Sequence, residues 1–248
     1  MSALVGSFMS PSSPAPFRGA AGAMADRPWL AAISGRSEGR TADGPRSLVR
    51  RAIDVTGALA GLMLLWPLML VVALAIRLDS PGPALFRQVR RGRGGQPFWL
   101  LKFRTMVVDA ERRLDELESR NESGGGVLFK LRDDPRVTRL GRFLRRSSLD
   151  ELPQLINVLR GEMSLVGPRP LSLRDSERLR DVDPVGSARR LQVLPGLTGP
   201  WQVAGRSELD YGQMVRLDLS YIANRSLGRD LAIIARTVVV VLIGRGAY

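Results

Sequence analysis

The sequence of 248 residues contains no cysteine and no histidine. Without cysteine the chain has no disulfide, no thiol nucleophile and no thiolate ligand for zinc. Without histidine it lacks the side chain that most often acts as a general base near neutral pH. Acid–base or covalent chemistry must therefore use carboxylates, lysine, serine, threonine or tyrosine.

Acidic and aromatic residues are also scarce. Lysine and arginine number 37 against 24 aspartates and glutamates, which gives a formal net charge of +13. An excess dominated by arginine suits bidentate contacts to phosphates or carboxylates, so we expect anionic partners. Aromatic residues make up only 6% of the chain, and no helix-turn-helix, RNA-binding or zinc-finger signature is present. These features favour a nucleotide or an acidic membrane surface over nucleic acid as the partner.

Residues 1–45 are rich in serine, proline, glycine and alanine and lack sustained hydrophobic periodicity. Such a composition buries too little apolar surface to offset the entropy of ordering, so we predict a disordered leader. It does not resemble a secretory signal peptide, because a charged start followed by a continuous apolar core is missing. We expect the chain to continue with a membrane segment at 46–80 and a second domain at 81–248.

Only one apolar run, residues 52–76, is long enough to cross a bilayer. Pro67 lies near its middle, where proline kinks or breaks a helix. Arginines flank the run on both sides, and such flanks favour the cytoplasmic face. Both flanks stay on that face if the segment is a re-entrant helix-break-helix. A spanning helix with a kink is the alternative, and a buried soluble helix is disfavoured because the run is apolar all round.

The segments 84–89 and 98–103 are separated by a Gly-Arg loop and predict a hairpin at the membrane surface. Three arginines at its tip are expected to contact lipid headgroups or solvent: Arg90, Arg91 and Arg93. Lys102 and Arg104 lie two positions apart and would share a face of a strand. From spacing alone they are two ordinary surface cations.

Several later stretches predict helices. Residues 107–120 have the pattern of a charged amphipathic helix, with Asp115 and Glu116 on a solvated face. Helices are also expected at 138–148, which is basic, and at 171–192, 209–221 and 230–244. The last is apolar but short for a bilayer, so we expect it to pack on the domain.

The stretch 144–170, LRRSSLDELPQLINVLRGEMSLVGPRP, carries the densest set of candidate functional groups. Asp150 and Glu151 are adjacent carboxylates before an apolar-periodic run, so they should lie at a helix N-terminus. Arg145 lies just before them and Arg169 just after, in a Gly-Pro-Arg-Pro turn. Two carboxylates among guanidiniums suit a divalent cation together with phosphate groups. For an isolated Asp-Glu pair, an N-capping acid in a charged surface turn is the alternative.

This stretch closely resembles the signature of the bacterial sugar transferases, the monotopic polyprenyl-phosphate phosphoglycosyl transferases. KFRTM at 102–106, LPGLTGPWQVAGR at 194–206 and GAY at 246–248 resemble the same family. Several long motifs in the same order make the resemblance specific, and it covers roughly residues 47–248. It implies transfer of a sugar-1-phosphate from a nucleotide diphosphate sugar to polyprenyl (undecaprenyl) phosphate. The donor that the resemblance implies is a UDP-sugar. A nucleoside monophosphate is released, and glycan or exopolysaccharide assembly begins.

The resemblance also implies roles for individual residues. Asp150 is expected to attack the phosphorus that bears the sugar, which forms a covalent Asp-phosphosugar intermediate. Glu151 is expected to hold Mg²⁺ or assist proton transfer, so Asp150 and Glu151 are the candidate metal ligands. Four basic residues are expected to bind or border the substrate phosphates: Arg145, Arg169, Lys102 and Arg104.

The expected fold is α+β and mostly helical, with a re-entrant membrane helix and a small membrane-surface catalytic domain that contains short strands. The resemblance implies the bacterial inner membrane, with the catalytic domain on the cytoplasmic face, and leaves open a homodimer. Two other classes of protein remain as alternatives. One is a membrane transferase with direct attack, for which Asp133 and Asp134 give thin support. The other is a non-enzymatic basic adaptor at a membrane or on nucleic acid.

Overall fold

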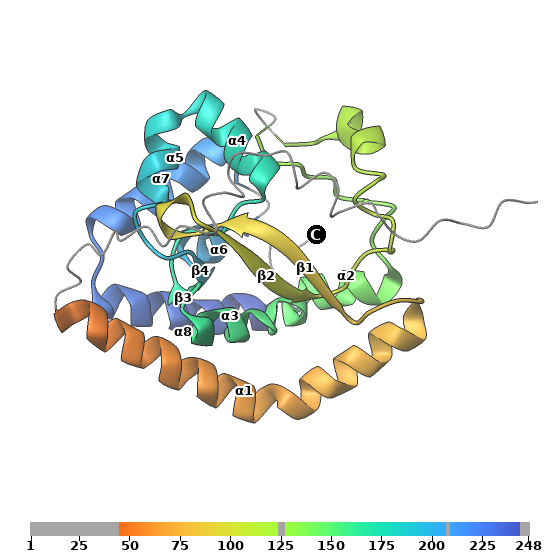
Figure 1. Ribbon diagram of the computed structural model, residues 1–248, viewed down its shortest axis with the longest axis horizontal. Helices are drawn as coiled ribbons and strands as arrows, with labels where there is room; N and C mark the ends of the chain where they lie inside the picture. Colours follow the sequence, from red (N-terminus) through yellow and green to blue (C-terminus); the bar gives the residue numbers. More distant parts are fainter. Residues whose placement is uncertain (1–44, 124–126, 207–208, 244–248) are drawn as a thin grey trace, which may run out of the picture. The chain divides into compact units, whose positions relative to one another are not determined.

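The computed structural model describes residues 45–123, 127–206 and 209–243 (Figure 1). They belong to one compact unit, Gly39–Tyr248, and the other unit, Met1–Glu38, lies outside the described residues. The disordered leader predicted for residues 1–45 falls outside them too, apart from its last position. The same is true of the terminal GAY motif at 246–248.

The described residues form a mostly helical α+β fold with two small sheets, as expected. The helices are α1 (Pro45–Asp79), α2 (Arg139–Arg146), α3 (Gln154–Arg160), α4 (Leu173–Val182), α5 (Pro184–Arg190), α6 (Pro200–Ala204), α7 (Tyr211–Ala223) and α8 (Leu227–Ile243). The 3₁₀ segments are η2 (Arg93–Gly95), η3 (Asp115–Arg120) and η4 (Leu149–Glu151). The strands are β1 (Leu85–Arg91), β2 (Pro97–Phe103), β3 (Ser164–Val166) and β4 (Gly196–Thr198).

Helix α1 holds the long apolar run and stays helical through Pro67. Figure 1 shows that it bends in its middle part instead of breaking into two helices. Proline removes one backbone hydrogen bond and clashes with the preceding turn, and a bend accommodates both effects. The helix is long and apolar enough to cross a membrane, and only 11% of its most apolar window is buried. An apolar surface that is exposed to this extent suits a lipid environment.

The predicted hairpin is confirmed. β1 and β2 pair antiparallel, with Leu85 opposite Phe103 and Arg91 opposite Pro97. Phe98 and Leu100 belong to a core cluster with residues of α1 and α3, so this face of β2 is turned towards the interior. Residues directly opposite each other in an antiparallel pair share a face, and the same face of β2 continues to Lys102.

The helix predicted for residues 107–120 is wrong. Turns occupy its first part, and only the 3₁₀ segment η3 follows. Met106 forms a bridge with Val137, and the Val107 amide donates to the Arg136 carbonyl, so the start of the stretch is paired in an extended form. η3 buries no residue, and a short helix without a buried face gains little from packing.

The other expected helices are present as α2, α4, α5, α7 and α8. Figure 1 shows α4, α5 and α7 grouped on the side of the hairpin away from α1. Their core includes Leu179, Trp201 and Met214. Helix α8 packs through Ile233 on Tyr221 and Val166, which confirms that the last apolar stretch packs on the domain.

Candidate active site

A cavity of about 920 Å³ brings together segments far apart in the sequence. Its walls come from α1, both strands of the hairpin, the α2–α3 connection, the Gly-Pro-Arg-Pro turn, α6 and α8. Five of the six residues expected at the site line it: Lys102, Arg145, Asp150, Glu151 and Arg169. The cavity is therefore the candidate active site.

Asp150 and Glu151 lie in η4 and not in the first turn of α3. Helix α3 begins only at Gln154, after Pro153, which is about one turn later than predicted. Ser148 immediately before η4 has a left-handed backbone, with φ of 57°. For a residue other than glycine this conformation costs on the order of 1 kcal/mol. The tight reversal turns the chain from α2 back into the cavity and leaves the Asp150 side chain 8% exposed.

Burial, together with the adjacent Glu151 charge, raises the pKa of Asp150 to about 6, although Lys102 and Arg145 oppose the shift. A carboxylate with this pKa is still largely ionised at neutral pH. It is also more basic than an ordinary aspartate. Asp150 thus combines accessibility to the cavity with a poorly solvated charge, the setting of a reactive carboxylate.

Arg145 reaches the cavity from the last turn of α2. The Thr138 side chain caps the start of this helix by accepting from the Gly141 amide. Gly141 packs so closely on the Thr105 backbone that an added Cβ would lie 2.0 Å from the Thr105 carbonyl oxygen. On the same residue, the Thr105 hydroxyl accepts from Arg145 Nε at 3.0 Å. The close approach of α2 to Thr105 therefore sets the position of the Arg145 guanidinium.

Arg169 is held from two sides. Its Nη1 donates to Glu151 Oε1 at 2.9 Å, and its guanidinium lies 5.4 Å from the centre of the Trp201 ring. Its carbonyl accepts from Arg190 Nη2 at 2.8 Å. Arg190 in turn pairs with the fully buried Asp218 at 2.8 Å. The buried pair anchors the turn, and the Arg169 side chain remains 36% exposed and available to a ligand.

Lys102 and Arg90 enter the cavity from neighbouring strands. Burial, followed by the Arg145 charge, lowers the pKa of Lys102 to about 7. Burial, followed by the Arg169 charge, lowers the pKa of Arg90 to about 10. Both shifts mark cations that lack sufficient counter-charge, and an anionic ligand would supply it.

The prediction that Arg90 lies at the hairpin tip and contacts lipid headgroups or solvent is wrong. It lies opposite Phe98 in the hairpin, so it shares a face with Phe98 and Lys102. Its guanidinium donates to the Pro170 carbonyl at 3.2 Å, next to Arg169. The alternation along the two strands could have found it, had the register of the hairpin been known.

Arg104 is the one expected site residue that does not line the cavity. Its guanidinium lies at the C-terminal end of α1 and donates to carbonyls of Ser80, at 2.8 Å, and Pro81. It thus satisfies carbonyls at a helix end, which lack partners within the helix. β2 ends at Phe103, so the alternation that directs Lys102 inwards no longer applies to Arg104.

Polar groups from α6 and from the residues that follow it also line the cavity. Trp201 and Gln202 are buried, line the cavity, and form no hydrogen bond through Trp201 Nε1 or either amide atom of Gln202 within the described chain. Arg206, at the end of the same motif, lines the cavity as well. Buried polar atoms without partners are costly, and a substrate that supplies the missing hydrogen bonds would remove the cost.

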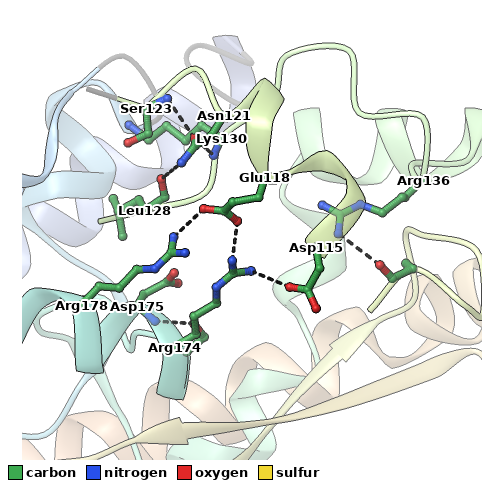
Figure 2. A network of polar contacts seen from close by, with 12 residues as sticks. Asp115, Glu118, Asn121, Ser123, Leu128, Lys130, Arg136, Arg174, Asp175 and Arg178 are labelled. Atoms are coloured by element: carbon green, nitrogen blue, oxygen red, sulfur yellow. Dashed lines mark hydrogen bonds and ion pairs between the residues drawn. The ribbon is translucent and has the colours of Figure 1, made fainter. Parts of the chain in front are cut away.

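The wall formed by residues 128–131 is held by a polar network (Figure 2). Asn121 accepts from the Lys130 amide and donates to the Leu128 carbonyl. In the preceding η3, Glu118 pairs with Arg174 and with Arg178, the latter at 2.7 Å. The network ties this wall to α4. Asp115, from the earlier Asp-Glu-Leu sequence, is 91% exposed and outside the cavity.

The metal-ligating capacity of the site is limited to few protein groups. The described residues contain no cluster of three or more acidic side chains that could hold a metal ion. Asp150 and Glu151 both line the cavity, and Arg169 engages Oε1 of Glu151. Mg²⁺ commonly binds one or two carboxylates together with substrate phosphates and water. The pair fits that pattern, with the remaining ligands supplied by a bound substrate.

A model of the bacterial sugar transferase family matches residues 45–244, and the chain belongs to this family. It is 44% identical to the galactosyl transferase CpsE of Streptococcus agalactiae, over 81% of this chain and 43% of that protein. It is 47% identical to a UDP-glucose:undecaprenyl-phosphate glucose-1-phosphate transferase of Caulobacter vibrioides, over 81% and 72% of the two chains. It is 42% identical to the exopolysaccharide production protein ExoY of Sinorhizobium fredii, over 80% and 88%.

The matched relatives differ in how much of their length this chain spans. It covers less than half of CpsE and most of ExoY. The matched part includes every cavity residue named above, because the family match extends from α1 to the end of α8.

Proposed function

We propose that the protein transfers a sugar-1-phosphate from a UDP-sugar to undecaprenyl phosphate, releases UMP, and thereby initiates exopolysaccharide assembly. The observation that carries the proposal is the buried Asp150, surrounded by Lys102, Arg145 and Arg169 in one cavity. A nucleophile beside several cations suits attack on a diphosphate. The name of the relative from Caulobacter vibrioides gives this type of reaction with UDP-glucose, and the name of the relative from Sinorhizobium fredii gives exopolysaccharide production.

The proposed reaction has two steps. A carboxylate oxygen of Asp150 attacks the phosphorus that carries the sugar, and the bond from this phosphorus to UMP breaks, with its electron pair leaving on UMP. An oxygen of undecaprenyl phosphate then attacks the same phosphorus and releases the Asp150 carboxylate. Arg145, Arg169 and Lys102 stabilise the negative charge that spreads over the phosphate oxygens.

Mg²⁺ is the proposed cofactor, held by Asp150 and Glu151 with substrate phosphates. When bound, it would neutralise phosphate charge. Glu151 also orients Arg169 through their 2.9 Å ion pair, independently of any metal.

Direct attack with Asp133 and Asp134 as metal ligands is less well supported. Asp134 is buried and forms a close ion pair with Arg136 at 2.6 Å. Its two carboxylate oxygens both accept hydrogen bonds from that guanidinium. Asp133 is exposed and does not line the cavity. Of these two carboxylates only Asp134 lines the cavity, and its ion pair with Arg136 already occupies it.

We propose that α1 enters and leaves the cytoplasmic leaflet of the bacterial inner membrane as a re-entrant helix. Both ends of α1 contact the same domain, which supports this course. Arg51 near its start donates to the Val158 and Leu159 carbonyls of α3, at 2.6 and 2.8 Å. At its other end, Arg104 holds the Ser80 carbonyl. A helix with its ends on opposite sides of a bilayer could not keep both contacts.

This topology can be tested with single cysteines, since the chain contains none. Leu48→Cys and Leu78→Cys place exposed thiols near the two ends of α1. In sealed membrane vesicles, a membrane-impermeant maleimide should label both from the same side as Val108→Cys, an exposed position of the domain. Labelling of Leu48→Cys and Leu78→Cys from opposite sides would refute the re-entrant course. Permeabilised vesicles provide the control for reactivity.

The covalent step is tested by intact mass. We expect purified protein with Mg²⁺ and the correct UDP-sugar, without lipid, to gain the mass of a phospho-sugar at Asp150. UMP should appear in equal amount. Turnover on addition of undecaprenyl phosphate without any such adduct would favour direct attack. Absence of both adduct and turnover across a panel of nucleotide sugars would count against the proposed function.

The rate should depend on pH through Lys102. Because its pKa is lowered to about 7, the side chain is a cation below this pH and loses its charge above it. We therefore expect kcat/KM for the donor to decline as pH rises through about 7. Lys102→Arg keeps the charge and should move this decline to higher pH. An unchanged profile in Lys102→Arg would assign the decline to another group.

A further inference from the structure

The cavity that holds the charged groups continues into an apolar limb between α1 and α8. Its lining residues are Ile53, Thr56, Gly57, Leu165, Leu197, Ile234, Thr237, Val238 and Val241. None of them carries a formal charge. One continuous space therefore has a charged end, with Asp150 and the cations, and an apolar end between two helices.

Polar contacts hold the two walls of this limb. Arg50 of α1 pairs with Asp230 of α8 at 2.8 Å, which joins the helices at their N-terminal parts. The Thr237 hydroxyl lies 2.6 Å from the Thr198 hydroxyl and fixes α8 against β4. These two contacts hold α8 beside α1 and β4. The part of the cavity lined by Gly57 and Val238 therefore lies between walls that polar contacts hold in place.

The α1 wall is fixed as well. Asp54 accepts from the Ser164 hydroxyl at 2.9 Å and from the Leu165 amide at 2.7 Å. An added Cβ at Gly57 would lie 2.7 Å from the Leu165 side chain, so α1 also packs tightly on this residue. These contacts set how far α1 stands from α8 at the level of the limb.

The limb opens where both helices expose apolar side chains. Val238, in its lining, is 56% exposed, and α1 exposes apolar residues along most of its length. If α1 lies in the membrane, the opening faces lipid. A ligand that fits the whole cavity is an amphiphile with an anionic head at the cations and an apolar tail reaching the bilayer.

We infer that the limb between α1 and α8 binds the isoprenoid chain of the polyprenyl phosphate acceptor next to its phosphate. The inference rests on the proposed function, because the acceptor is the substrate with this chemistry. It assigns α8 to acceptor binding. A membrane anchor formed by α1 alone would leave the tail of the acceptor without a defined path to Asp150.

Adjacent residues of α8 provide a matched pair for the test. Val238 lines the limb, whereas Val239 does not, and they are 56% and 54% exposed. We expect Val238→Trp to raise KM for undecaprenyl phosphate by roughly tenfold or more, because the indole fills the space of the chain. KM for the donor should change less than twofold, and Val239→Trp should change neither value. Equal acceptor KM values in the two variants would overturn the inference.

A second measurement avoids a bulky substitution. Val238→Cys and Val239→Cys each introduce the single thiol of the chain. Undecaprenyl phosphate in detergent micelles should slow maleimide labelling of Val238→Cys relative to Val239→Cys, and a non-phosphorylated polyprenol should do so less. Equal slowing of both would indicate bulk partition of lipid and would overturn the inference. Failure of the proposed function is distinct, because the unsubstituted protein would then transfer no phospho-sugar to undecaprenyl phosphate.

Discussion

Asp150→Asn is expected to reduce transfer by more than about a thousandfold and to abolish the covalent phospho-sugar adduct. The amide has nearly the shape of the carboxylate but is a poor nucleophile. The substitution also removes a buried charge, so the folded protein should tolerate it. Loss of activity with an unchanged thermal unfolding midpoint would then report the chemistry of this group.

The chain contains its own control for this substitution. Asp115 begins a second Asp-Glu-Leu sequence, at 115–117, identical to the one that Asp150 begins. Its side chain is nevertheless 91% exposed and lies outside the cavity. Asp115→Asn should retain both adduct and turnover. A mass adduct that persists in Asp150→Asn, mapped to another carboxylate, would move the nucleophile elsewhere. Near-normal turnover without an adduct would exclude the covalent route altogether.

Arg169→Ala is expected to lower kcat/KM for the donor roughly a hundredfold. The guanidinium is oriented by Glu151 and carried on a turn anchored by the Arg190–Asp218 pair, so its charge is held at the cavity before substrate binds. Such preorganised charge stabilises a transition state more than a mobile surface cation does. Arg169→Lys should recover only part of the loss, because lysine lacks the planar fork.

Arg146→Ala is the matched control for this prediction. Arg146 lies beside Arg145, is exposed, and does not line the cavity. Its removal lowers the net charge by the same amount and should leave donor kinetics within about twofold, because a screened surface charge contributes little. If Arg146→Ala and Arg169→Ala lowered kcat/KM equally, general electrostatic attraction would account for both losses.

Most of the candidate site could be predicted from sequence because its residues are clustered along the chain. Arg145, Asp150, Glu151 and Arg169 lie within one stretch of 25 positions and reach the same cavity. Closeness along the chain keeps them near one another, and contacts with Thr105 and Arg190 then set the positions of Arg145 and Arg169. The start of the helix after them was misplaced by one turn, because the Ser148 reversal has no signature in the residue pattern.

The predictions that failed concern residues whose positions depend on contacts with segments far away in the sequence. Arg90 lies within β1 and Arg104 follows β2. Only the register of β1 with β2 directs Arg90 into the cavity, and only the end of β2 at Phe103 directs Arg104 to α1. The stretch 107–120 has a helical pattern, but pairing with residues 136–137 takes its first backbone groups. Local propensity is weaker than such tertiary contacts.

The sequence by itself limited acid–base or covalent chemistry to carboxylates, lysine, serine, threonine and tyrosine, because the chain has neither cysteine nor histidine. It also determined that residues 52–76 form a long apolar helix, because the length and the apolar composition of this run can be read directly from the sequence. Only the tertiary structure decided that α1 and α8 line one cavity with the charged groups, and that Lys102 and Arg90 of the hairpin line it too. A cavity is space between elements, and its position depends on packing distances that no local pattern encodes.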